Sequence, residues 1–280
     1  MPTASSRSPS KRRTKRRKTR ARTKTLTTMP TTQNSKPLVR VTQIEAFRRY
    51  FYQSEHDNYE IPEQSVIDSI TGAFQGNEMT RIGTAFHALV QTGCQPCSLA
   101  PAGSRSFTYY GKEKQEPVPE GRTFLVDGHE VTLDLSQIKV ALDYRYRHIN
   151  AFHEVRRFYD FGPAVVTGCA DMIDGVQIRD IKTKFSPPQD DSYVNSCQWR
   201  YYLQIFGADV FSFDLFCFEG YKLEKHGYDV RGLPLTPHTP PICLYRYADM
   251  ERDNRILLEE FLEWVDKRSL TSYLLNQTIK

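Results

Sequence analysis

The sequence predicts an α/β fold in which a mixed central sheet is flanked by helices. Three observations support this prediction. Apolar residues recur at helical spacing early in the chain, as in segments 44–51 and 82–90. The dipeptide Asp174-Gly175 separates two strand-like runs and is a strong hairpin signal. A phenylalanine-rich run at 210–219 is typical of a strand buried on both faces. At 280 residues, the chain is long enough for such a sheet with covering helices.

The N-terminal segment is strongly basic. The chain has 38 Lys and Arg residues and 33 Asp and Glu residues, but the first 44 residues hold thirteen of the basic ones and none of the acidic ones. The remaining body is therefore acidic. We expect residues 1–40 to form a disordered basic arm and residues 41–280 to form the folded domain, because residues 1–36 lack aromatic residues and apolar periodicity.

A flexible polycation binds nucleic-acid backbones by releasing counterions, without reading sequence. This use is expected of the densest part of the arm, which consists of Lys11, Arg12, Arg13, Lys15, Arg16, Arg17 and Lys18. Two other readings remain open: a nuclear import signal and an Arg-rich organelle transit peptide.

Hydropathy and cysteine usage indicate the compartment. No run of about 18 apolar residues is present, so no membrane association is expected. The charged N-terminus lacks the apolar region of a signal peptide. We expect an intracellular protein, either in the cytoplasm of a bacterium or phage host or in a eukaryotic nucleus or organelle. Cys94-x-x-Cys97 lacks a partner pair for zinc, and the cysteines are read as reduced thiols.

The remaining elements follow from local patterns. A helix at 41–51 is expected to begin at a Thr42 cap. Periodicity and turn signals predict further helices at 63–74, 80–92, 135–146, 193–206 and 249–275, a hairpin at 122–133, strands at 153–161 and 242–247, and loops at 100–120, 185–192 and 227–241.

The segment 165–202 contains the residues that could bind a metal ion or take part in catalysis. A tight turn at Asp174-Gly175 would place Asp171 opposite Ile178 on paired strands. Because side chains alternate along a strand, Asp171, Asp180 and Lys182 would share one face. The two acids would be diagonal neighbours, roughly 7–8 Å apart at the backbone. Two carboxylates and an amine would therefore converge.

This combination suits hydrolysis of a phosphodiester. Carboxylate oxygens bind Mg²⁺ or Mn²⁺, which takes one or two protein carboxylates and completes its shell with water and phosphate. A neighbouring lysine can orient or deprotonate the attacking water and offset charge on the phosphate. The alternative reading is a half-exposed hairpin on which Asp180 and Lys182 decorate a solvated face.

Four motifs in order resemble those of the PD-(D/E)XK nucleases, in particular the RecB-like branch that includes phage, mitochondrial and CRISPR-associated exonucleases. The resemblance covers roughly residues 41–209 and is specific only as a set. The motifs are Arg81-Ile82-Gly83-Thr84-Ala85-Phe86-His87, Gly168-x-x-Asp171, Asp180-Ile181-Lys182-Thr183 and Gln198-x-x-x-Tyr202.

The resemblance implies a restriction-endonuclease-like core and a role for each motif residue. Asp171 and Asp180 would hold Mg²⁺ or Mn²⁺, with the Ile181 carbonyl as a further ligand. Lys182 would activate water. The same comparison implies supporting roles for His87 and Gln198, with Tyr202 beside Gln198, and a weaker metal role for Glu154 on the preceding strand. Without the resemblance, His87 would be read as a surface or hydrogen-bonded histidine and Tyr202 as core.

The expected activity is that of a metal-dependent DNA nuclease, with an exonuclease in recombination, repair or replication favoured by resemblance alone. DNA is the expected partner, and a single-strand annealing or binding protein is a further candidate. Some relatives carry an iron–sulfur cluster with three closely spaced C-terminal cysteines, which this chain lacks, so no cluster is expected. The competing class is a catalytically idle nuclease fold that binds nucleic acid or acts as a scaffold.

Overall fold

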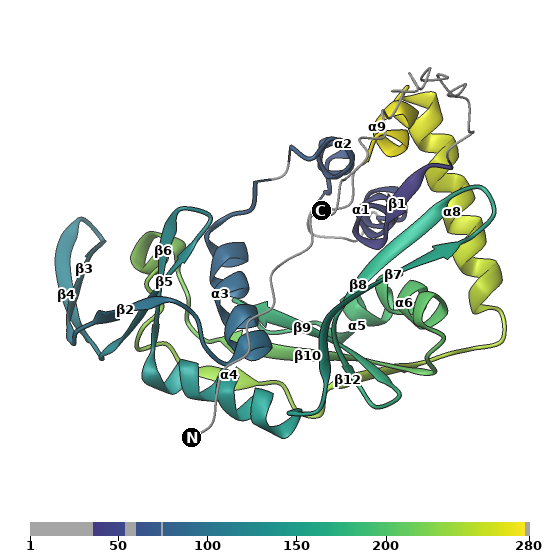
Figure 1. Ribbon diagram of the computed structural model, residues 1–280. Coiled ribbons are helices and arrows are strands. Elements are labelled where there is room, and N and C mark those ends of the chain that lie inside the picture. Colours follow the sequence, from purple (N-terminus) through teal and green to yellow (C-terminus); the bar gives the residue numbers. More distant parts are fainter. Residues whose placement is uncertain (1–35, 54–59, 74, 278–280) are drawn as a thin grey trace, which may run out of the picture. The chain divides into compact units, whose positions relative to one another are not determined.

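The computed structural model describes residues 36–53, 60–73 and 75–277, in which helices surround a mixed sheet (Figure 1). The helices are α1 (Val41–Phe51), α2 (Glu63–Thr71), α3 (Glu78–Thr92), α4 (Leu135–Arg147), α5 (Asp190–Val194), α6 (Gln198–Phe206), α7 (Leu223–His226), α8 (Met250–Lys267) and α9 (Thr271–Leu275). The strands of the main sheet are β1 (Leu38–Arg40), β7 (Phe152–Asp160), β8 (Val165–Asp174), β9 (Gln177–Lys184), β10 (Val210–Phe218), β11 (Leu235–Pro237) and β12 (Ile242–Tyr245).

The main sheet contains both parallel and antiparallel pairs. β8 is antiparallel to β7 and to β9, and parallel to β1. β9 runs parallel to β10, and β10 is antiparallel to β11 and β12. The central mixed sheet flanked by helices, predicted from the sequence, is therefore confirmed.

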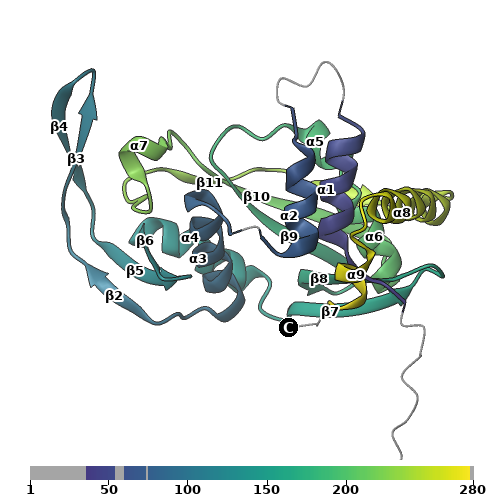
Figure 2. The same ribbon diagram turned by 90° about the horizontal axis from the view of Figure 1, so that it is seen from above.

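Strand β10 separates two hydrophobic cores. Phe211 and Phe213 point into the first core, which includes Phe47 of α1, and which α6 and α8 also cover. Phe216 points into the second core, where it packs against Phe86 of α3 and against α4. The predicted burial of this strand on both faces is confirmed, and Figure 2 shows the two groups of helices around the sheet from a second direction.

Two smaller sheets lie outside the main one. One contains β2 (Cys97–Ala100), β5 (Gly121–Val126) and β6 (His129–Asp134), and the other contains β3 (Gly103–Tyr109) and β4 (Lys112–Val118). The predicted hairpin at 122–133 is confirmed, because β5 and β6 meet at Asp127-Gly128, where both residues have positive φ. The loop predicted at 100–120 is wrong, because β3 and β4 occupy it. Both faces of these strands are largely exposed, so no apolar alternation marks them in the sequence.

Two predicted helices and one predicted loop are interrupted. The helix expected at 193–206 is two helices, since α5 ends before Asn195 and α6 starts at Gln198. The helix expected at 249–275 breaks after Lys267, where the N–H groups of Arg268 and Leu270 both return to the Val265 carbonyl. β11 forms within the loop expected at 227–241.

The described chain enters the sheet before the expected start of the domain at Val41. Leu38–Arg40 pairs with β8, and residues 1–35 lie outside the described part. The Thr42 cap is wrong, because Arg40 occupies the N-cap position and donates its backbone N–H to Gln43 Oε1 at 2.8 Å. Among the described residues, no helix combines the length and apolar character needed to cross a membrane.

Candidate active site

The β8–β9 hairpin carries the predicted acids, but in a register that differs from the expected one. Asp174 pairs with Gln177 and Ile173 with Ile178, so Gly175 and Val176 form the turn. The shift relative to the expected pairing is two residues. Because a shift of two keeps every side chain on its face, Asp171, Asp180 and Lys182 remain on the same side of the hairpin.

Asp180 is the buried centre of the polar group. Its side chain is only 3% exposed. Gln198 of α6 donates from Nε2 to Asp180 Oδ1 at 2.6 Å. Asp180 Oδ2 forms no hydrogen bond but lies 2.7 Å from Lys182 Nζ, which makes a close ion pair. Both carboxylate oxygens are thus held by polar groups from different elements.

The surroundings shift the pKa values of this pair. Burial raises the pKa of Asp180 to about 6, and the charge of Asp171 adds to the rise, while Lys182 opposes it. Burial works to lower the pKa of Lys182, but Asp180 and Asp171 outweigh it and raise that pKa to about 12. The lysine is therefore an ammonium donor in this arrangement, and its side chain is 38% exposed.

Asp171 is tied to the same group through the backbone. The N–H of Ile181 donates to Asp171 Oδ2 at 2.8 Å. His87 Nδ1 of α3 lies 3.7 Å from the same oxygen. β8 and β9 pair over three residue pairs and then separate, which leaves the Ile181 N–H available to the aspartate. The four predicted residues Asp171, Asp180, Lys182 and His87 are therefore brought together by α3, β8 and β9.

Two glycines of the motifs permit this close packing. A Cβ atom at Gly83 of α3 would lie 2.7 Å from Thr183 Oγ1 of β9, so only glycine allows this approach of helix and strand. A Cβ atom at Gly168 would lie 3.3 Å from the Tyr202 ring. The tyrosine is buried in the first core, and its hydroxyl donates to the Cys169 carbonyl at 2.8 Å. Tyr202 thus packs beside the polar group rather than contacting the acids.

Glu154 lies on β7 opposite the region of Asp171. Its neighbours His153 and Val155 pair with Met172 and Ala170, while Glu154 itself has a φ of 50° and leaves the ladder. A non-glycine residue in the left-handed region is uncommon and carries strain, which is often found at functional sites. The carboxylate is 3.4 Å from Cys169 Sγ.

A cavity of about 930 Å³ opens beside these residues. Its wall includes Glu154 and the motif residues Gly83, Thr84, His87, Ile181, Lys182 and Thr183. It also includes residues that the sequence did not single out: Arg49, Asn77, Met79, Thr80, Ala88, Gln91, Lys184, Phe185 and Ser186. His87 and Lys182 of the polar group thus lie in the wall of this space, while Asp171 and Asp180 lie behind them and are not among the described lining residues.

Cations dominate the charged residues of this wall. The described lining contains three cationic residues, Arg49, Lys182 and Lys184, and one acid, Glu154. Burial lowers the pKa of Lys184, and the charges of Arg49 and Lys182 lower it further. The sequence could have predicted Lys184 as a wall residue, because it lies two residues after Lys182 on the same strand and so shares its face. Arg49 had no sequence signal, because α1 is far away in the chain.

The donor set fits a hard divalent ion. Asp180 Oδ2 is a buried oxygen without a hydrogen bond, whose close polar neighbour is the Lys182 ammonium, and Asp171 supplies a second carboxylate nearby. The Ile181 carbonyl stays an expectation from the resemblance. Within 36–53, 60–73 and 75–277, no cluster of three or more His, Cys, Asp or Glu side chains is arranged to hold a metal. A site with one or two carboxylates is the arrangement that Mg²⁺ commonly uses, with water and substrate completing its shell.

The basic arm residues Lys11 to Lys18 lie outside the described residues.

The comparisons with known proteins show no family for this chain. No protein-family model matches the chain, and a search of curated proteins finds no match. Two solved structures are similar over most of the chain. The crystal structure of SSO0001 has 14% identity and a TM-score of 0.35 over 84% of this chain and 79% of that one. A protein named "Putative exonuclease" from Eubacterium rectale has 13% identity and a TM-score of 0.37 over 87% and 83%. Both TM-scores are below 0.5, so neither likeness carries an argument about family or activity.

Proposed function

We propose that the chain is a Mg²⁺- or Mn²⁺-dependent nuclease of the PD-(D/E)XK superfamily, in the RecB-like branch, that hydrolyses phosphodiester bonds in DNA. The observation that carries this proposal is the buried Asp180, whose two oxygens are held by Lys182 and Gln198 beside Asp171. Lys182 of this group lines a cavity whose charged residues are mostly cationic. A buried carboxylate with a raised pKa is costly to maintain, which favours a chemical role over a structural one.

Each side chain of the site would have a separate role in the reaction. The divalent ion would polarise the phosphate and lower the pKa of a bound water. Lys182, as an ammonium, would donate to the attacking water or to a phosphate oxygen and offset developing negative charge. Gln198 holds Asp180 in one orientation, and the Ile181 N–H does the same for Asp171. Arg49 and Lys184 on the wall would attract the neighbouring phosphates of the strand.

Action from DNA ends is part of the proposal, and it rests on the resemblance of the four motifs. An exonuclease of this kind would work in recombination, repair or replication, and a single-strand annealing or binding protein is its proposed partner. The single-stranded or double-stranded preference and the polarity would both be read from one time course on 5′- and 3′-labelled oligonucleotides.

The test compares Asp180→Ala and Lys182→Ala with the wild-type chain on end-labelled DNA in Mg²⁺. Each substitution should lower the cleavage rate by about 10²-fold or more while DNA binding is kept, because each removes a group that acts mainly in the reaction. Asp143→Ala and Lys139→Ala are matched controls, since this pair forms an exposed ion pair on α4. The controls should cleave at the wild-type rate.

Two outcomes would reject the proposal. Equal degradation by Asp180→Ala, Lys182→Ala and wild type would mean that a contaminant or another site cleaves the DNA. Wild-type protein that binds DNA but cleaves neither single nor double strands in Mg²⁺ or Mn²⁺ would instead support the competing class, an idle nuclease fold.

A further inference from the structure

The hairpin of β3 and β4 is a two-stranded arm that pairs with no other strand in the described structure. Its register runs from Gly103 opposite Val118 to Tyr109 opposite Lys112, and Tyr110-Gly111 forms the turn. Figure 2 shows the two strands side by side, ending in a free tip. The element therefore costs ordering entropy without contributing to either hydrophobic core.

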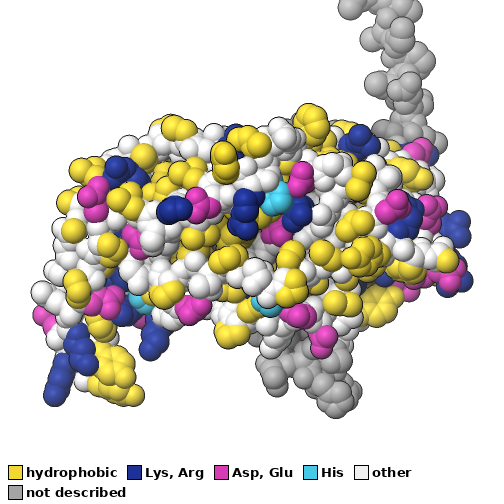
Figure 3. All heavy atoms as spheres, turned by 90° about the horizontal axis from the view of Figure 1, so that it is seen from below, with side chains coloured by type: hydrophobic (Ala, Val, Ile, Leu, Met, Phe, Trp, Pro, Cys, Tyr) yellow, Lys and Arg dark blue, Asp and Glu magenta, His cyan; other side chains and the backbone are white. Residues whose placement is uncertain are grey.

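One face of the arm mixes aromatic and cationic side chains. Directly opposite residues share a face, so Tyr109 and Lys112 lie together, as do Phe107 and Lys114. Lys114 Nζ lies 4.5 Å from the centre of the Tyr109 ring. At the base of this face, Lys225 Nζ of α7 lies 4.6 Å from the centre of the Phe107 ring. Figure 3 shows Lys or Arg side chains and hydrophobic side chains gathered at the end of this hairpin, at the lower left.

Tyr110 at the turn is an unusual residue for its position. Its φ is 49°, in the left-handed region that asparagine and glycine accept more readily than a bulky side chain. Its side chain is 88% exposed, and its ring meets the Tyr109 ring edge to face at 4.5 Å between centroids. Folding gains little from this aromatic group, so the strained and exposed ring points to a use outside the fold.

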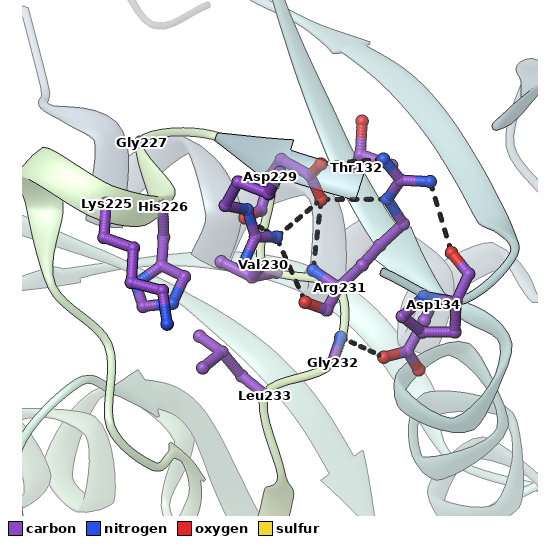
Figure 4. Close-up of polar contacts among 12 residues, drawn as sticks. Thr132, Asp134, Lys225, His226, Gly227, Asp229, Val230, Arg231, Gly232 and Leu233 are labelled. Atoms are coloured by element: carbon purple, nitrogen blue, oxygen red, sulfur yellow. Dashed lines mark hydrogen bonds and ion pairs between the residues drawn. The ribbon is translucent and has the colours of Figure 1, made fainter. Parts of the chain in front are cut away.

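Two half-buried arginines fix the base of the arm. Arg105 of β3, with a side chain 8% exposed, donates to the carbonyls of Asp229 and Arg231. Arg231 donates to the carbonyls of Pro101 and Pro119, which flank the two strands. Figure 4 shows Arg231 bonded to Asp229, and Gly232 bonded to Asp134 in the same cluster. The arm is thus held at its base while its tip stays exposed.

The charge on the aromatic face is positive. The acid on this face is Glu116, which pairs with Arg105 at 2.8 Å and also with Lys225. Lys112 and Lys114 nearer the tip have no acidic partner among the described residues, and Glu113 points to the opposite face. Protein-binding surfaces are depleted in lysine at their centres, whereas aromatic rings interleaved with cations are typical of surfaces that bind single-stranded nucleic acid.

We propose that the tip of this hairpin is a stacking platform for the unpaired bases of single-stranded DNA, separate from the cavity that Lys182 lines. The Tyr109 and Tyr110 rings would stack on base faces, and Lys112 and Lys114 would contact the adjacent phosphates. A duplex hides its base faces, so the platform selects single strands without reading their sequence. This inference rests on the proposed action on DNA, and it names a second point at which the substrate is held.

The test measures binding of a fluorescein-labelled oligothymidylate to the full-length protein at about 150 mM salt. Tyr109→Ser and Tyr110→Asn should each weaken binding about tenfold. Tyr109→Phe and Tyr110→Phe keep a ring and should stay within about twofold of wild type. Affinity for a blunt duplex should be unchanged by all four. Tyr110→Asn should not lower the thermal midpoint, because asparagine suits the positive φ, whereas a purely structural tyrosine would make this substitution destabilising.

Salt separates the two kinds of contact. Lys112→Ala and Lys114→Ala should each reduce the slope of log affinity against log salt by roughly 0.7, the value expected for one phosphate on a single strand. Tyr109→Ser should lower affinity by the same factor at every salt concentration, because stacking releases no counterions.

The failure of this inference is distinguishable from failure of the nuclease proposal. If Asp180-dependent cleavage is seen but the tyrosine substitutions leave oligothymidylate affinity unchanged, the platform is wrong and the nuclease proposal stands. If no cleavage is seen but binding depends on Tyr110, the platform stands and the nuclease proposal falls. Loss of self-association in the tyrosine variants with unchanged DNA affinity would assign the tip to contacts between copies of the chain and overturn the platform.

Discussion

At the scale of single residues, the geometry around Asp180 depends on one neutral hydrogen-bond donor. Gln198 contributes an amide to Asp180 Oδ1, while the opposite oxygen faces an ammonium. A neutral donor favours the ionised acid without adding a second charge, and burial already raises the pKa of Asp180 to about 6. Any additional negative charge at this position should therefore have a measurable effect on pH dependence.

We predict that Gln198→Glu moves the acidic limb of the pH–cleavage profile upward by about one unit or more. A carboxylate placed at the 2.6 Å contact would repel ionised Asp180 and raise its pKa further, so more of the acid is protonated at any given pH. Cleavage rates measured from pH 5 to pH 9 give the limb.

Gln91→Glu is the control for Gln198→Glu, because it adds the same charge to the cavity wall without contacting Asp180. Its limb should move much less. An acidic limb in Gln198→Glu that stays in place or moves down would show that Asp180 does not control the profile.

Sequence patterns located the acids but not all of their neighbours. Asp171, Asp180 and Lys182 share a face because side chains alternate along a strand, which local sequence alone determines. A shift of two residues in the strand pairing leaves each side chain on the same face. Arg49 reaches the cavity only because α1 packs against β8 and α6 in three dimensions. No periodicity within α1 distinguishes this exposed arginine from one that serves solubility.

At the scale of elements, the spacing between α3 and β9 positions His87 against Asp171. The absence of a side chain at Gly83 sets this spacing, since Thr183 Oγ1 lies only 2.7 Å from where a Cβ atom would be. His87 and Gly83 lie one helical turn apart on α3, so a displacement of the helix at one is carried to the other.

We predict that Gly83→Ala lowers the free energy of unfolding by about 1–3 kcal/mol and reduces cleavage, because the new methyl group overpacks the contact. Thr183→Ala removes the opposing hydroxyl, so the double substitution should recover most of both losses. Urea unfolding and cleavage rates on the four proteins of the cycle give the coupling. Losses that simply add would show that the two residues do not set the spacing.

The arm of β3 and β4 shows where element prediction from sequence fails. Helices α1, α3 and α4 were predicted because each buries one stripe against a core. The arm buries almost nothing, and its strands alternate between two exposed faces, so the hydrophobic pattern used to find strands is absent. The α5–α6 break has no local sequence signal for a related reason: Glu45 of α1 accepts the Cys197 N–H at 2.8 Å, a contact that no local pattern contains.

At the scale of the whole molecule, charge is divided between a basic N-terminal segment and an acidic remainder. We predict that deletion of residues 1–35 weakens DNA binding at about 150 mM salt and flattens its salt dependence, because the lost cations no longer release counterions. The deletion should stop before Lys36, whose ammonium lies 2.6 Å from Asp160 Oδ2 in the folded chain.

Cleavage of short oligonucleotides at saturating concentration should survive this deletion, because the cavity residues are untouched. Affinity titrations between 50 mM and 300 mM salt, a range over which the Debye length falls by about 2.4-fold, compare the two proteins. If affinity and slope are the same for both, the basic segment serves as an address signal rather than a DNA tether.

The opening of the β8–β9 hairpin after three pairs also links reaction rate to the sheet as a whole. β1 and β7 pair with β8, which carries Asp171, and β10 pairs with β9, which carries Asp180. The distance between the two carboxylates therefore depends on how these two halves of the sheet are positioned. The Ile181 N–H bridges that seam through Asp171. Substitutions far from the cavity that slide one half against the other should therefore slow turnover well before they unfold the protein.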